Sequence, residues 1–310
     1  MKLVSIIVPT RNEEKALEKL LKSLKRQTYK NYEVIVVDGG STDGTERVAK
    51  KYGAKFIREY GKYKSPANAR NIGMQKAKGE IAIVLDCDYE VGDRFLEEGV
   101  KAFLNKEIMG VVCSHKLAED TPVEKTLASK IKTRTGIVHV YPIFTRRGFI
   151  QKMGSWDASL GYGEDRDLNN NILRYNEKHK GKALRTNGPA AVIHLPHTLS
   201  ELSAQQRWYG RTIKHYLKKG KGAKEYLPLL KVFYILVPVA ILMALFKPEL
   251  WLPVAVLSLP FVLVSLYRTA MALIRGKIWG LCLLPIDVFM SFPFAYGLIE
   301  SLFRRERGRD

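Results

Sequence analysis

The sequence predicts an α/β protein with a doubly wound, mostly parallel sheet, followed by a C-terminal helical membrane region. Apolar runs of strand length alternate with helical patterns over residues 3–85, and long stretches almost without charge fill residues 229–303. Alternation of this kind is typical of parallel sheets with crossover helices. A hydrophobic content of 46% and a charged content of 26% exclude a disordered protein and a disulfide framework.

The elements of the N-terminal part follow from local patterns. Short β-branched and apolar runs predict strands at 3–9, 33–38, 55–57 and 81–85. Apolar residues at helical spacing predict helices at 16–24, 43–52 and 67–78. Asn12 is the expected cap of the first helix, and Thr42 or Asp43 that of the second.

Polar residues follow Val8, Val37 and Leu85, the last apolar residues of three predicted strands. In parallel sheets ligands bind beyond the carboxyl ends of the strands, so these polar residues indicate a binding site. Neither a dinucleotide fingerprint nor a phosphate-binding P-loop motif occurs in the sequence. This disfavours an NAD-dependent enzyme and an ATP-hydrolysing one.

The Asp86-Cys87-Asp88 triplet ends a buried strand. Two carboxylates at an exposed strand end can share a divalent cation and a ribose hydroxyl, and Mg²⁺ or Mn²⁺ is typically bound by carboxylates together with diphosphate oxygens. The alternative interpretation is a solvated turn. The position of the triplet after an apolar strand favours the metal site.

Asp38 and Arg70 are candidates for contacts to a nucleotide. Asp38 ends the second strand, where its carboxylate could accept an N–H from a base edge, while the following glycines allow close approach. Arg70 begins a helix at the sheet edge and could pair with a diphosphate. The alternative for Arg70 is an ordinary surface arginine.

Glu164 and Asp165 stand at the start of a predicted helix in a glycine-rich turn, close in sequence to Trp156, which is a candidate for the acceptor side. A carboxylate there can take a proton from an attacking hydroxyl, although acids at helix starts are commonly caps. His194 follows a short strand and is a candidate metal ligand or a structural histidine, with His197 three residues on.

Arg207 and Trp208 precede a lysine-rich run. Arg207 could neutralise a leaving diphosphate. Trp208 could stack on a sugar or lie at a membrane interface.

The C-terminal part contains two apolar segments of spanning length, 229–246 and 250–267, and a third, 278–303, interrupted by prolines and acids. Basic clusters precede the first segment, follow the second and close the chain, and the positive-inside rule puts all three on the cytoplasmic side. We therefore prefer two spans plus a broken re-entrant or interfacial element; three spans and a buried helical core are alternatives. The expected domains are a catalytic domain at 1–227, with a basic interfacial C-terminal part, and a membrane region at 228–310.

Residues 1–227 carry a net charge of +16, out of +20 for the whole chain. Basic residues beside a membrane helix are attracted to anionic lipid. The basic residues are not interleaved with aromatic residues, and the sequence has no helix-turn-helix or zinc-finger spacing. Nucleic acid is therefore not an expected partner.

Taken together, these motifs resemble glycosyltransferase family 2, with its GT-A fold. The resemblance covers about residues 3–210 and rests on PTRNE, VVDGGSTDGT, ARNIG, DCD, RRGFIQKMGSWD and GYGEDRDL. It implies donor-side roles for Pro9, Glu13, Asp38 and Arg70, a ribose and metal site at Asp86 and Asp88 completed by His194 or His197, and Asp165 as the catalytic base. It also implies an inverting transfer in which the metal supports the departing nucleoside diphosphate.

Two departures from the family matter. Ala204 stands where processive synthases carry the glutamine of their QxxRW motif, which argues against a polymer-conducting synthase. The layout also resembles polyprenyl-phosphate sugar synthases, but Asp88 is followed by Tyr89-Glu90-Val91-Gly92 rather than a proline-containing stretch.

The prediction is therefore a multi-pass membrane glycosyltransferase with a cytoplasmic catalytic domain. It would transfer sugar from a UDP- or GDP-sugar to a lipid-linked hydroxyl, since a hydroxyl needs a general base and a phosphate does not. The alternatives are a polyprenyl-phosphate sugar synthase and, in another class, a non-catalytic nucleotide-binding membrane protein.

Overall fold

The structure is a computed structural model that describes residues 1–130, 142–161, 163–218, 242–247, 249 and 251–303. The chain divides into two compact units, one of Met1–Leu117 with Arg134–His194 and one of Ala118–Thr133 with Leu195–Arg307. The predicted domain boundary at residue 227, most of the predicted span 229–246 and the C-terminal arginine cluster lie outside the described residues.

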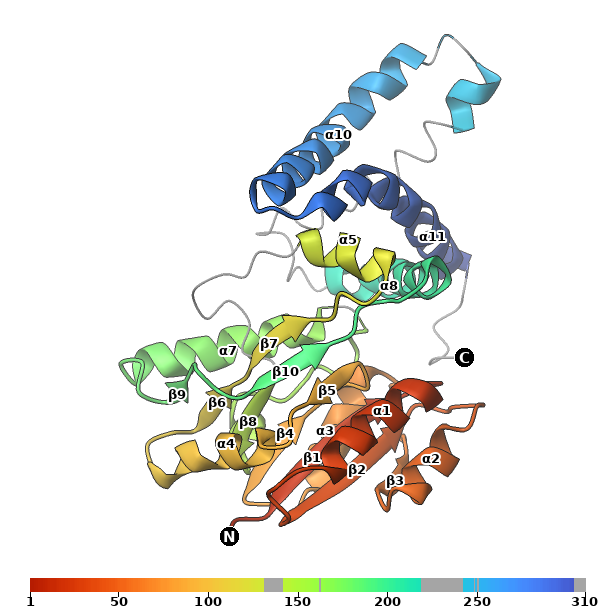
Figure 1. Cartoon of the computed structure of the whole chain (residues 1–310). Coiled ribbons are helices and arrows are strands. Elements are labelled where there is room, and N and C mark those ends of the chain that lie inside the picture. The colour runs from red at the N-terminus through yellow and green to blue at the C-terminus, as the bar shows by residue number, and fades with distance from the viewer. Residues whose placement is uncertain (131–141, 162, 219–241, 248, 250, 304–310) are drawn as a thin grey trace. The chain divides into compact units, whose positions relative to one another are not determined.

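The first unit is built on a seven-stranded mixed sheet (Figure 1). Its strands, in spatial order, are β3 (Lys55–Arg58), β2 (Tyr32–Asp38), β1 (Val4–Thr10), β4 (Ile81–Val84), β8 (Ile143–Arg146), β6 (Gly110–Val112) and β9 (Leu184–Arg185). The first four are parallel, as the sequence predicted. β8 runs antiparallel to both β4 and β6, so the sheet is mixed beyond β4.

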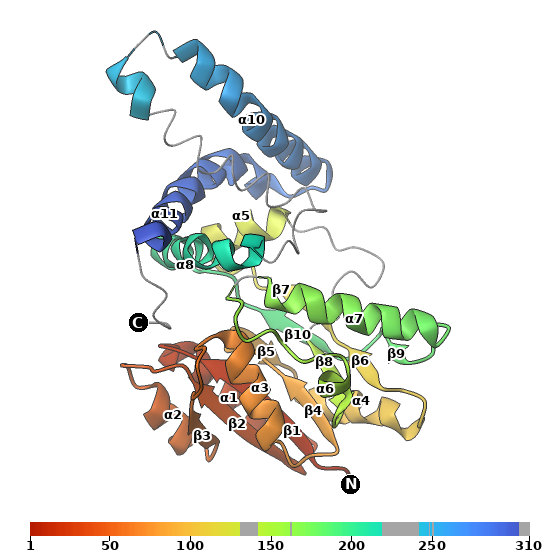
Figure 2. The ribbon, with the colours of Figure 1, turned by 180° about the vertical axis from the view of Figure 1, so that it is seen from behind.

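Helices cover both faces of this sheet because residues of each strand alternate between them. In β1, Ile6 and Val8 pack into the cluster beneath α1, α2 and α4, whereas Ile7 packs into the cluster beneath α3, α6 and α7 (Figures 1 and 2). The helices are α1 (Glu14–Lys25), α2 (Thr45–Lys51), α3 (Pro66–Lys76), α4 (Phe95–Lys101), α6 (Phe149–Lys152) and α7 (Glu164–Lys178), with a 3₁₀ turn, η1, at Ala102–Leu104. The unit is thus a three-layer α/β fold.

A second, three-stranded sheet lies in the same unit. β10 (Ala190–Ile193) pairs antiparallel with β5 (Tyr89–Val91) and parallel with β7 (Ser114–Leu117). The pairing of β10 with β5 continues into a hydrogen bond from the His194 N–H to the Asp88 carbonyl, 2.8 Å. The late histidine is therefore brought next to the Asp86-Cys87-Asp88 turn.

The structure corrects both predicted helix caps. Asn12 has a left-handed backbone (φ 54°) and its side chain accepts the Thr42 N–H, while Glu13 takes the cap position of α1. Gly44, rather than Thr42 or Asp43, takes the cap position of α2. Asp43, one residue earlier, accepts hydrogen bonds from the N–H groups of Thr45 and Glu14. The Asn12 prediction failed because the loop after β2 competes for its side-chain oxygen, which no local pattern reveals.

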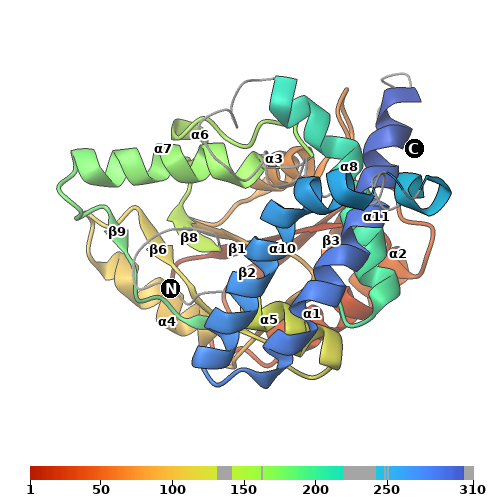
Figure 3. The same ribbon diagram turned by 90° about the horizontal axis from the view of Figure 1, so that it is seen from above.

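The second unit is helical in its described part. It contains α5 (Pro122–Lys130), α8 (Leu199–Lys218), α10 (Trp251–Ile274), η3 (Ile278–Cys282) and α11 (Leu283–Phe303). α8 and α11 lie side by side (Figures 1 and 3). At their closest approach both carry glycine: a Cβ on Gly210 would lie 2.0 Å from the Phe294 carbonyl oxygen, and one on Gly297 2.0 Å from that of Arg207.

The third apolar segment consists of the 3₁₀ turn η3 followed by the α-helix α11, which its prolines do not break, although the sequence predicted a broken element. Pro285 lies in the first turn of α11, where its missing N–H removes no helical hydrogen bond, and the helix continues through Pro293. By length and composition alone, Ile278–Ser301 could cross a membrane, and 39% of its apolar 18-residue window is buried. The acids of this segment are paired within the unit: Asp287 with Ser265, and Glu300 with Arg207.

Candidate active site

Arg70 occupies the centre of the site in the first unit. It lies on α3, which Ser65 caps by accepting the Asn68 N–H, and its side chain is almost completely buried. Nη2 donates to both carboxylate oxygens of Asp86, at 3.1 Å each. Nη1 donates to Glu164 Oε1 at 2.9 Å and to Asp165 Oδ1 at 3.2 Å. One guanidinium therefore joins the predicted ribose and metal carboxylate to the predicted catalytic pair.

The Arg70 cluster, defined as Arg70, Asp86, Glu164 and Asp165, carries more negative than positive charge. Of its three carboxylates, Glu164 is the most deeply buried, at 7% exposed. Burial and the neighbouring Asp165 raise the pKa of Glu164 to about 7, against the opposing effect of Arg70. Glu164 can therefore exchange a proton near neutral pH, whereas Asp86 and Asp165 reach solvent with about a third of their side-chain surface.

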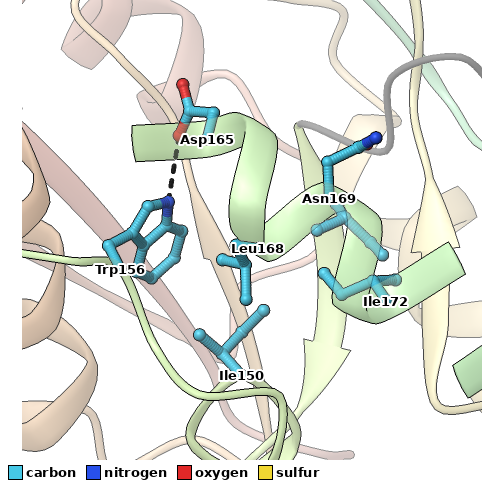
Figure 4. A pocket seen from close by; sticks show the side chains of 7 residues that line it. Ile150, Trp156, Asp165, Leu168, Asn169 and Ile172 are labelled. Atoms are coloured by element: carbon cyan, nitrogen blue, oxygen red, sulfur yellow. Dashed lines mark hydrogen bonds between the residues drawn. The ribbon is translucent and has the colours of Figure 1, made fainter. Parts of the chain in front are cut away.

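Trp156 contributes a second donor to Asp165. Its indole Nε1–H donates to Asp165 Oδ1 at 3.0 Å (Figure 4). The backbone of Trp156 is held by Asn71, the residue after Arg70: Asn71 Nδ2 donates to the Trp156 carbonyl at 2.7 Å, and the Trp156 N–H donates to Asn71 Oδ1 at 3.1 Å. The sequence placed Trp156 near the site but gave no reason to single out Asn71.

A small cavity opens beside this pair. It has a volume of about 10 Å³, room for roughly one water-sized group. Its walls are apolar except near Asp165 and Asn169 (Figure 4) and are formed by Ile143, Ile150, Trp156, Asp165, Leu168, Asn169 and Ile172. The carboxylate of Asp165 thus lies at the border between an apolar pocket and solvent.

Asp86, Asp88 and Glu13 form an acidic corner at the carboxyl ends of β1 and β4. Asp88 is exposed, yet desolvation by the surrounding protein and repulsion from Asp86 and Glu13 raise the pKa of Asp88 above its usual range. Cys87 points the other way, into the core, with its thiol 3.7 Å from the Pro9 carbonyl. Carboxylates that repel one another suit a hard divalent cation, which would offset their charge. The acidic corner is therefore the candidate site for Mg²⁺ or Mn²⁺.

The two histidines end in different units. His194 lies beside Asp88 through its backbone, and its Nε2 is 3.4 Å from Glu90 Oε2. His197 belongs to the second unit, where its Nδ1 lies 3.3 Å from Glu124 Oε1. His194 and His197 both stay predicted ligands of the metal site.

Asp38 is held by its own loop. It is 2% exposed, and its carboxylate accepts the N–H groups of Gly40 and Ser41 and the Ser41 hydroxyl. Glu59, which the sequence did not single out, accepts the Ser65 N–H at 2.7 Å and an Asn68 Nδ2–H at 3.0 Å. It orders the turn between β3 and α3, close to Gly39 of the Asp38 loop.

Arg207 and Trp208 lie on α8 in the second unit. The Arg207 Nε donates to Glu300 Oε2 at 2.9 Å and its guanidinium carbon lies 4.6 Å from the centre of the Tyr296 ring. The rings of Trp208 and Tyr209 are 5.4 Å apart. Their predicted roles toward diphosphate and acceptor stay predictions.

Comparison with known proteins decides the family. The model of the family described as Glycosyl transferase family 2 matches residues 5–161, just over half of the chain. The chain belongs to glycosyl transferase family 2. The matched region contains Asp38, Arg70, the Asp86-Cys87-Asp88 turn and Trp156, and it ends shortly before Glu164.

Two curated family relatives share part of the chain. It is 30% identical over 188 residues to an uncharacterized glycosyltransferase of Rickettsia typhi, covering 56% of this chain and 59% of that protein. It is 36% identical over 103 residues to the glycosyltransferase AglE of Haloferax volcanii, covering 31% and 34%. The match thus spans less than two thirds of the length of either relative.

A solved structure shares the fold over nearly the whole chain. It is the mannosyltransferase PcManGT from Pyrobaculum calidifontis in complex with GDP-Man and Mn²⁺, with a TM-score of 0.53 and 21% identity, covering 98% of this chain and 88% of that one. The predicted GT-A-like α/β fold is thereby confirmed.

Proposed function

We propose that this protein is a membrane-anchored, inverting glycosyltransferase that transfers a sugar from a nucleotide diphosphate donor to a lipid-linked hydroxyl. The observation that carries the proposal is the Arg70 cluster. It joins a carboxylate suited to the donor side, Asp86, to a carboxylate suited to proton transfer, Asp165, through one buried guanidinium.

Asp165 has the position that a general base needs. Its carboxylate accepts hydrogen bonds from Arg70 and Trp156 at one oxygen and reaches solvent, so an acceptor hydroxyl could approach it. Taking the hydroxyl proton as the oxygen attacks the anomeric carbon is the step that a sugar acceptor requires. An acceptor phosphate would attack without such a base, and the Trp156–Asp165 hydrogen bond therefore supports the hydroxyl acceptor.

The donor would bind along the carboxyl edge of the sheet. Asp86, Asp88 and Glu13 would hold the cation, with His194 adjacent, and Asp38 would lie on the nucleoside side. When bound, the cation supplies charge neutralisation for the diphosphate. PcManGT, with GDP-Man and Mn²⁺, supports a nucleotide-sugar donor and a divalent metal by likeness of fold.

The helical second unit would anchor the enzyme, with the first unit, which this proposal makes the catalytic unit, in the cytoplasm. Support comes from α10, which exposes large apolar side chains along its length, among them Leu252, Val256, Leu259, Leu263 and Leu266. Such an apolar surface is costly in water and favourable in lipid. Arg268, Arg275 and Lys277 near the end of α10 fit a cytoplasmic, anionic leaflet.

The test is transfer of labelled sugar into an organic-extractable product. The full chain receives UDP- and GDP-sugars in turn, Mg²⁺ or Mn²⁺, and polar lipid from its host. We expect metal-dependent label in the lipid phase, reduced by at least about 100-fold in Asp165→Asn, because the base is lost while the shape is kept. Asp93→Asn, at an exposed aspartate outside the site, is the matched control and should transfer at the wild-type rate.

Three other outcomes would change the proposal. Full activity of Asp165→Asn with a polyprenyl phosphate acceptor would favour the polyprenyl-phosphate sugar synthase. Nucleotide binding without transfer to any lipid would favour the non-catalytic alternative. Transfer to a water-soluble acceptor alone would contradict the lipid-linked one.

A further inference from the structure

The hydrogen bonds to Asp165 are one-sided. Arg70 Nη1 and Trp156 Nε1 both donate to Oδ1, at 3.2 and 3.0 Å. The other oxygen of Asp165 points away from the indole (Figure 4). Two donors on one oxygen fix the rotation of the carboxylate and determine which oxygen faces an incoming group.

Trp156 is itself held rigidly. Asn71 closes two hydrogen bonds with its backbone, and the Ser65 hydroxyl donates to the Ala158 carbonyl at 2.7 Å two residues further on. The indole is 4% exposed and packs in the cluster that contains Ile150 and Leu168. The donor to Asp165 is therefore attached to α3, the same helix that carries Arg70.

We propose that Trp156 is a positioning residue for the transfer, whose indole N–H orients the Asp165 carboxylate so that Oδ2 meets the acceptor hydroxyl. This rests on the proposed function, in which Asp165 is the base. Asn71 supports the arrangement by fixing the Trp156 backbone.

A purely structural role of Trp156 predicts a different effect of its substitution. A buried indole N–H needs an acceptor, and Asp165 would satisfy it without any effect on catalysis. In that case Trp156→Phe, which keeps an aromatic ring but removes the N–H, would change stability slightly and leave turnover alone. A positioning role instead requires loss of turnover at unchanged donor binding, since a small misplacement of a reacting group slows the chemical step.

The first experiment tests the contact without using activity. The full chain labelled with ¹⁵N-tryptophan gives indole resonances for its four tryptophans, and Trp156→Phe identifies the one from Trp156. We expect this resonance to move upfield in Asp165→Ala, because a hydrogen bond to a carboxylate is lost. An unmoved resonance would show that the contact does not form in solution and would overturn the proposal.

The second experiment measures turnover with the donor and lipid extract that serve the wild-type protein. We expect Trp156→Phe to lower kcat roughly 10- to 100-fold, with the donor KM changed less than about twofold because Asp165 lies on the acceptor side. Trp251→Phe, which removes the N–H of an exposed indole on α10, is the matched control and should keep the wild-type kcat.

The outcomes separate the two proposals. A wild-type protein that transfers no sugar would refute the proposed function and, with it, the role of Trp156. Wild-type transfer with a normal kcat in Trp156→Phe would refute the positioning role and leave the proposed function standing. A raised donor KM at normal kcat would place Trp156 on the donor side, which also overturns the proposal.

Discussion

Two carboxylate sites lie in the catalytic unit, and they are stabilised in opposite ways. The Asp38 carboxylate is satisfied by groups two and three residues further along the chain, Gly40 and Ser41. In the Arg70 cluster, the three carboxylates lie 16, 94 and 95 residues from Arg70 along the chain. The first site is a product of local sequence, whereas the second exists only in the folded unit.

The Asp38 loop and the Arg70 cluster also differ in their balance of charge. The Asp38 carboxylate accepts its hydrogen bonds from neutral groups of its own loop. In the Arg70 cluster one guanidinium serves three carboxylates, and burial and repulsion by Asp165 keep Glu164 partly protonated near neutral pH. Substitutions in the Arg70 cluster should therefore affect stability and activity together, and those in the Asp38 loop should affect them less.

The largest effect is expected for Arg70→Met. The variant keeps the length of the side chain but leaves the buried Glu164 without its partner, which costs about 3–5 kcal/mol. For a unit of this size we expect the melting temperature to fall by roughly 10 °C, and transfer to be lost because Asp86 and Asp165 are no longer joined. Thermal unfolding and the transfer assay measure both.

Arg70→Lys sharpens this expectation. An ammonium restores the charge but not the planar fork that reaches Asp86 and Glu164 at once, so stability should recover more than activity. If Arg70→Met were as stable as the wild-type protein, the cluster would not be the charge centre that its hydrogen bonds indicate.

Glu164→Gln gives the next largest effect, and the effect depends on pH. The pKa of Glu164 is raised from 4.5 to about 7 in the folded protein. The stability that its bound proton contributes is therefore complete below about pH 4.5 and is lost as the pH rises through 7. Relative to the wild-type protein, Glu164→Gln should gain up to about 3 kcal/mol of stability between these pH values, because glutamine remains neutral throughout.

Melting temperatures of both proteins from pH 5 to pH 8 test this expectation. The two curves should converge toward low pH and separate toward high pH, with the variant melting higher. Curves that stay parallel would show that Glu164 is ionised across the whole range.

The contrast between the two sites also explains what the sequence could predict. Strands β1 to β4, the helices between them and the gathering of polar residues at their carboxyl ends follow from local patterns, and the structure has them within a few residues. Asp86, Glu164 and Asp165 were identified because each lies at the end of a strand or the start of a helix. Arg70 was identified as well, but as a partner of a diphosphate. Its role as the common partner of these carboxylates was not predicted, because the contacts join residues far apart in the chain.

Other features depended on pairing between distant segments. The antiparallel β8 has four residues, β6 three and β9 two, and such strands are too short for periodicity to reveal their partners. Asn71 lies in the quoted ARNIG motif, yet its role depends on Trp156, 85 residues further on. Asn12 was misassigned as a cap for the same reason, since its partner, Thr42, lies 30 residues away.

The smallest effect is expected at the Asp38 loop, and it decides whether Asp38 contacts the nucleoside. Asp38→Asn keeps one acceptor oxygen but turns an amide toward N–H donors, which costs about 1 kcal/mol of stability. The pH dependence set by Glu164 should be unchanged.

The donor KM of two variants distinguishes the possible roles of Asp38. If Asp38 acts only by ordering its loop, Ser41→Ala, which removes one donor to the carboxylate, should raise the donor KM by a factor similar to that of Asp38→Asn. If the carboxylate binds the base edge directly, Asp38→Asn should raise the donor KM at least about tenfold while Ser41→Ala changes it little. Because the carboxylate already accepts three hydrogen bonds from its own loop, we expect the two variants to behave alike. A large difference between them would show that the carboxylate binds the base edge directly.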